Sequence, residues 1–122
     1  MTISQGAAVE YIEKLYGGRY EENDVIVSVG TAATRIVGNS PDRLTLTIIN
    51  YGANTVYLQP INAPAVKQGI IIDAQGGSVS MNVRDDLTLP SLEWWGIADT
   101  AASDIFVLEV TRYRLPAATK GA

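Results

Sequence analysis

Hydrophobic and polar residues alternate along most of the chain from Asp24 onward, in short runs separated by turn residues. In the run LTLTIIN, residues 44–50, Leu44, Leu46 and Ile48 fall on one side and two threonines on the other. A period of two residues predicts a β-strand with one buried face. The other runs with strand character span residues 24–29, 33–37, 55–59, 69–73, 78–83, 92–98 and 105–115.

Turn residues agree with this interpretation. The segments YGAN, AQGG and DTAASD carry Gly, Asn or Asp where the chain must reverse. Seven or eight short strands at this regular spacing are typical of an antiparallel sandwich or barrel. We predict an all-β fold, an antiparallel, jelly-roll-like β-sandwich over residues 24–115, between a helical arm over residues 1–23 and a flexible tail over residues 116–122.

The predicted arm follows a different period. In residues 4–18, Val9, Ile12 and Tyr16 share one face of a short amphipathic helix, which a glycine pair can end. A helix of two to three turns is marginal alone. Its apolar stripe therefore needs a surface, which is either its own domain or a neighbouring subunit.

Composition argues against several classes of function. The 122 residues include no cysteine and no histidine, and the formal net charge is −4. The chain therefore lacks disulfide chemistry, the usual general base and the commonest metal ligand. Its nine basic residues are scattered, which argues against a nucleic-acid surface. The apolar runs are too short for a membrane span, and the first residues lack the features of a signal peptide.

Acidic residues are the remaining candidates for chemistry. Oxygen ligands for calcium are offered by the turn aspartates Asp85, Asp86, Asp99 and Asp104. Their spacing matches no known calcium loop, so solvated turns are the simpler interpretation. Glu93 and Glu109 are options for a hydrolytic carboxylate pair, but their strand positions favour solvent exposure. We predict a protein that is not an enzyme, with no catalytic, cofactor or metal site.

Aromatic residues indicate an interface. Trp94 and Trp95 are neighbours in a predicted strand, so one should fill the core while the other stands outside. An exposed tryptophan suits a protein interface or sugar stacking, and packing of both within the domain is the alternative. The candidate partner-interface residues are Val9, Ile12, Tyr16, Tyr51, Tyr57, Trp94 and Arg112.

The segment NSPDRLTLTIINYGANTVYLQP, followed by IDAQGGSVSMNV, LEWWGIA and IFVLEVTR, resembles small β-sandwich structural proteins of tailed-bacteriophage virions. These are proteins of the head-decoration or head-fibre type. The resemblance covers residues 38–112 and is a pattern of turns and strands. Its matching positions are Arg43, Asn50, Gly52, Ala53, Asn54, Gly76, Gly77, Trp95 and Glu109.

This resemblance implies a non-enzymatic virion protein, made in the host cytoplasm, that binds the virion lattice in multiple copies. Its expected partners are the major capsid protein or another virion protein, and copies of itself, with a trimer favoured. No cofactor, nucleic acid or membrane is implied. A tail or baseplate component and a carbohydrate-binding sandwich that recognises a host glycan are the alternatives.

Overall fold

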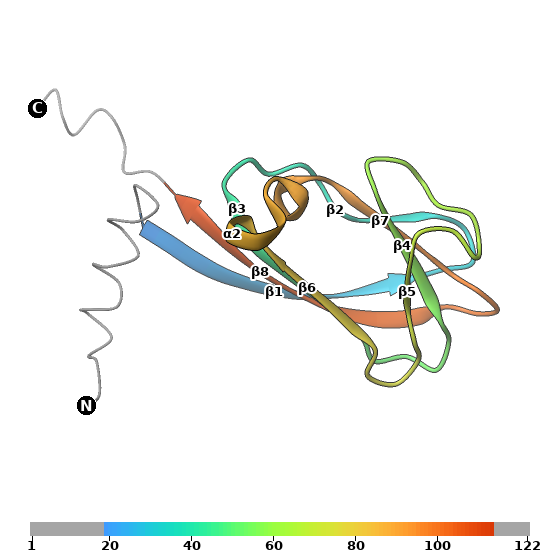
Figure 1. Ribbon diagram of the computed structural model, residues 1–122. Helices are drawn as coiled ribbons and strands as arrows, with labels where there is room; N and C mark the ends of the chain where they lie inside the picture. The colour runs from blue at the N-terminus through green and yellow to red at the C-terminus, as the bar shows by residue number, and fades with distance from the viewer. Residues whose placement is uncertain (1–18, 114–122) are drawn as a thin grey trace, which may run out of the picture.

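The computed structural model describes residues 19–113 (Figure 1). The predicted arm residues Val9, Ile12 and Tyr16, and the predicted tail, lie outside the described residues. The first strand begins at Arg19, so residues 19–23 belong to a sheet and not to the arm, which corrects the predicted boundary. Pairing explains the difference, because this strand stays in register with the last strand along its whole length.

Eight strands, one short helix and one 3-10 turn make up the described chain. They are β1 (Arg19–Val29), β2 (Thr34–Val37), β3 (Arg43–Asn50), β4 (Val56–Pro60), β5 (Ile70–Ile72), β6 (Ser78–Asn82), α2 (Val83–Asp86), η1 (Leu89–Ser91), β7 (Trp94–Ala98) and β8 (Ser103–Tyr113). Neither helical segment in this part of the chain is long and apolar enough to cross a membrane.

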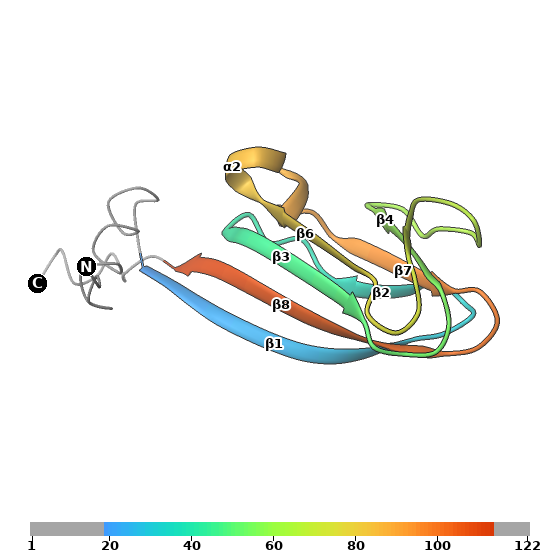
Figure 2. The same ribbon diagram turned by 60° about the horizontal axis from the view of Figure 1, so that its bottom comes forward.

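The strands form two four-stranded sheets, in the orders β1-β8-β3-β6 and β2-β7-β4-β5 (Figure 2). Every pairing is antiparallel, and the first strand pairs with the last, the second with the seventh, the third with the sixth and the fourth with the fifth. This order is the jelly-roll arrangement of an antiparallel sandwich. The predicted all-β sandwich is confirmed.

The core lies between the two sheets. Its largest fully buried apolar side chains are Trp94, Leu46, Ile48, Leu58, Ile72, Ile105, Val29, Val56 and Val107. The predicted inward positions Leu46 and Ile48 are confirmed, but Leu44 does not share their burial. The register of β3 against β8 shifts between Arg43 and Thr45, and Arg43 becomes the buried residue there. A bulge of this kind re-aims side chains that simple alternation would place.

Candidate interaction surface

The two tryptophans of β7 lie on opposite sides of their sheet, as alternation predicts. Trp94 is 1% exposed and its Nε1 donates a hydrogen bond to the Leu89 carbonyl at 3.0 Å. Trp95 is half-buried on the outer side, opposite Arg35 and Gln59 of the adjacent strands. The prediction of Trp94 as an interface residue is therefore wrong, because this side chain fills the core.

Tyr57 lies on the outer side of β4 but is only 8% exposed. It stands opposite Ile97 of β7 and Ile71 of β5, so apolar side chains flank it on both neighbouring strands. Its prediction as a contact residue is therefore wrong, because a buried ring cannot meet a partner.

Tyr51 is 57% exposed and remains a candidate contact. Its ring stacks on Phe106 of β8, with centroids 5.7 Å apart and an interplanar angle of 20°. Phe106 stands directly opposite Ile49 of β3 and Ile26 of β1. We call Ile49, Phe106 and Ile26 the outer apolar row, because they cross the outer face of the β1-β8-β3-β6 sheet at one level.

Arg112, the remaining predicted interface residue, forms an ion pair with Asp42. Its Nη2 lies 2.8 Å from Asp42 Oδ1, and its backbone N–H donates to the Asp42 carbonyl at 2.7 Å. Both side chains are partly exposed, so water weakens the attraction between them. The pair fastens the turn before β3 to the end of β8, and a role of Arg112 toward a partner stays a prediction.

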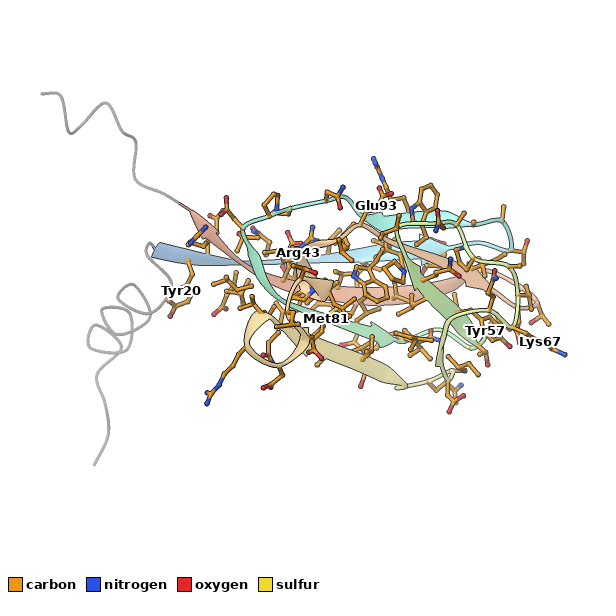
Figure 3. All side chains as sticks on the ribbon, turned by 45° about the horizontal axis from the view of Figure 1, so that its top comes forward. Tyr20, Arg43, Tyr57, Lys67, Met81 and Glu93 are labelled. Atoms are coloured by element: carbon orange, nitrogen blue, oxygen red, sulfur yellow. The ribbon has the colours of Figure 1, made fainter. Side chains whose placement is uncertain are left out.

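A buried arginine organises one end of the sandwich. Arg43 Nε donates to Glu109 Oε2 at 2.8 Å, and Nη2 donates to the Gly38 carbonyl at 2.9 Å. Nη1 donates to the carbonyls of Pro90 and Leu92, each at 3.2 Å. Figure 3 shows Arg43 within the fold, whereas Lys67 points away from it. This Arg43 cluster joins β8, η1 with the residue after it, and the segment between β2 and β3. Glu109 was predicted to face solvent, and this prediction is wrong, because its carboxylate pairs with the buried Arg43.

A buried asparagine, Asn50, likewise organises another part of the sandwich through side-chain hydrogen bonds. Asn50 Nδ2 donates to the carbonyls of Asn54 at 2.7 Å and Ile72 at 3.2 Å. Its Oδ1 accepts from the Gly52 N–H at 3.1 Å and from Ser103 Oγ at 2.7 Å. This Asn50 cluster satisfies a fully buried amide, and it ties the loop after β3 to the end of β5 and the start of β8.

Two of the acidic candidates, Asp85 and Asp86, are used for local structure. Asn82 caps α2 by accepting from the Asp85 N–H at 2.8 Å, and Asp86 accepts from the Asn82 N–H at 2.9 Å. Such reciprocal bonds are typical of a helix N-terminus. Across residues 19–113, no group of three or more acidic side chains lies together in a way that could hold a metal ion.

The sequence matches no known protein family and no curated protein. Among solved structures, the chain is similar to one from the endospore appendages of Bacillus, which form disulfide-linked pili. The sequence identity is 14% and the TM-score is 0.44, over 79% of this chain and 89% of that chain. Likeness at this level concerns the fold alone.

Sequence reasoning missed both polar clusters and the outer apolar row. Five positions of the resemblance take part in the two clusters, Arg43 and Glu109 in one and Asn50, Gly52 and Asn54 in the other. Their hydrogen bonds are internal, so they hold the loops in place. On the outer face of the β1-β8-β3-β6 sheet, the outer apolar row lies beneath the exposed Tyr51, and we take this face as the candidate interaction surface.

Proposed function

We propose that this protein is a non-enzymatic structural subunit of a tailed-phage virion, either a head-decoration or a head-fibre-base protein. It would bind the capsid lattice in multiple copies. The observation that carries the proposal is the outer apolar row with Tyr51, because Ile26 and Tyr51 are both more than half exposed and apolar surface gathered on one face is typical of interaction sites. The resemblance over residues 38–112 supplies the biological setting.

The use of the polar side chains supports a structural role. Glu109 is engaged by Arg43, and Ser103 donates its hydroxyl to Asn50. An acid or a nucleophile in a reaction must be free to meet a substrate. Here the same groups join strands to loops, as expected of a rigid building block.

The carbohydrate-binding alternative is less well supported. Stacking on a sugar needs an exposed aromatic face, and both Tyr57 and Trp94 are buried. Of the tryptophan pair, only Trp95 stays partly exposed on the outer side. We therefore favour the structural role.

Cosedimentation tests the proposal. Purified full-length protein is mixed with undecorated capsids, and separately with tails, and the bound fraction is measured on a density gradient. We expect binding to capsids that falls in Tyr51→Ser, which removes the exposed ring. Ile71→Ser is the matched control, because Ile71 is 62% exposed but lies in the other sheet. Protein that sediments with neither capsids nor tails would contradict the virion role.

A further inference from the structure

Strand β1 leaves a long edge open. It forms one border of its sheet, and β8 is its only strand partner within residues 19–113. β1 has 11 residues, whereas the other border strands β6, β2 and β5 have five, four and three. Unpaired N–H and C=O groups along such an edge form a template for pairing with another strand, and short border strands limit this tendency.

The acidic residues of β1 all lie in the first part of the strand. Glu21, Glu22 and Asp24 occupy its first half, and charged side chains protect a strand edge from pairing. The second half, residues 25–29, reads VIVSV and carries no charge. Val25 and Ile26 in this half are both about half exposed, on opposite faces of the strand. The unprotected half is therefore the part suited to a partner strand.

The outer apolar row ends at this unprotected half. Ile49 and Ile26 both stand opposite Phe106, so the row crosses β3, β8 and β1 and stops at the open edge. Ile26 is 54% exposed there. Directly opposed apolar side chains stabilise neighbouring strands. A further strand with an apolar residue opposite Ile26 would continue the row.

We propose that the open edge of β1 pairs antiparallel with β1 of a second copy, about a two-fold axis that runs perpendicular to the sheet, midway between the two Ile26 residues. Each Ile26 then faces its counterpart, Val25 faces Val27, and Asp24 faces Ser28. The two sheets become one eight-stranded sheet, and the outer apolar row runs across both copies. A two-fold contact of this kind uses the same surface on each subunit.

The side chains of β1 disfavour registers that are shifted toward its acidic first part. An axis between the two Val25 residues would set Asp24 against Ile26, and an axis between the two Asn23 residues would set Glu22 against Asp24. A buried unpaired acid or two opposed acids destabilise a strand pair. The axis between the two Ile26 residues avoids both arrangements and brings apolar residues together at the centre, which identifies a copy of this chain as the fitting partner.

The inference deepens the proposed function and rests on it in one respect, since a multi-copy subunit needs a contact between copies. The contact closes on two subunits, whereas the resemblance implies a trimer. The two ideas are separable. A monomer that still binds capsids would overturn the inference alone, and a dimer that binds no virion particle would overturn the function alone.

Sedimentation equilibrium of the full-length protein tests the contact. We expect a dimer whose dissociation constant rises at least about tenfold in Ile26→Lys, because two ammonium groups would face each other across the axis. Ile71→Lys is the matched control: it adds the same charge at a similarly exposed isoleucine on a border strand of the other sheet, and it should leave the dimer unchanged. Far-ultraviolet circular dichroism checks that each variant is folded.

Mixing two variants tests the register itself. I26K and I26E should each be monomeric alone, and an equimolar mixture should recover the dimer, because Lys then faces Glu across the axis. Wild-type protein that stays monomeric up to its solubility limit, or forms a trimer, would overturn the proposal. So would I26K that dimerises as tightly as wild type, or a mixture that remains monomeric.

Discussion

Replacing Arg43 by Met tests whether the Arg43 cluster holds one end of the sandwich together. The change keeps much of the aliphatic volume and removes the guanidinium. Four hydrogen bonds disappear, with lengths of 2.8, 2.9, 3.2 and 3.2 Å. Three backbone carbonyls and the Glu109 carboxylate then lose their donor, in a region where Arg43 itself is buried.

Loss of one partner of a buried ion pair costs about 3–5 kcal/mol. The Glu109 side chain is 24% exposed, so water recovers part of its interaction, and we expect a loss of about 3 kcal/mol. This is a large share of the roughly 5–15 kcal/mol that stabilises a typical domain. Urea unfolding followed by tryptophan fluorescence measures it as a lower midpoint at an unchanged slope.

Asp42→Asn is the control for this measurement. It weakens the partly exposed ion pair with Arg112, which should cost about 0–1 kcal/mol. If R43M loses no more stability than D42N, the Arg43 cluster does not hold the fold as described. A changed slope in R43M would instead show that the native or unfolded state had altered in compactness.

Two further changes test close packing and backbone strain. Gly52→Ala should lower the free energy of unfolding by about 2 kcal/mol or more, because the new Cβ would overlap Ser103 Oγ and lie 2.8 Å from the Asp104 nitrogen. Gly30→Ala is its control, with 3.8 Å to the nearest atom, and equal losses would contradict the argument. Leu87→Gly should raise the free energy of unfolding by roughly 1 kcal/mol, because the exposed Leu87 has a φ of 57°. A lower thermal midpoint in this variant would show that strain is absent there.

Alternation along the sequence predicted most of the strands and the inward side of β3. It succeeded at Leu46 and Ile48, which alternate with threonines on the opposite side. The pattern is local, and burial of one sheet face imposes it directly. Strand number and spacing were sufficient for the fold class.

Alternation was insufficient where both faces of a strand are apolar. In β8, Ile105 and Val107 point inward while Phe106 and Leu108 point outward, and all four are hydrophobic. Two adjacent tryptophans present the same ambiguity in β7. The choice depends on the register with neighbouring strands, which the sequence of one strand does not contain.

The polar clusters were unpredictable for a different reason. Arg43 is buried because a bulge turns it inward and because carbonyls of Pro90 and Leu92, almost fifty residues away, accept its hydrogen bonds. The start of β1 at Arg19 likewise depends on pairing with Tyr113. Long-range acceptors and partners of this kind leave no periodic signal in the chain.

The pairing of the first strand with the last affects how the protein is made. β1 leaves the ribosome early, but its partner β8 is among the last described residues to be synthesised. Contacts of such large sequence separation fold slowly, and an unpaired strand is prone to wrong association until they form. The negative charges of Glu21, Glu22 and Asp24 therefore matter before folding as well as after it, because they oppose pairing of β1 with a wrong strand until β8 is made.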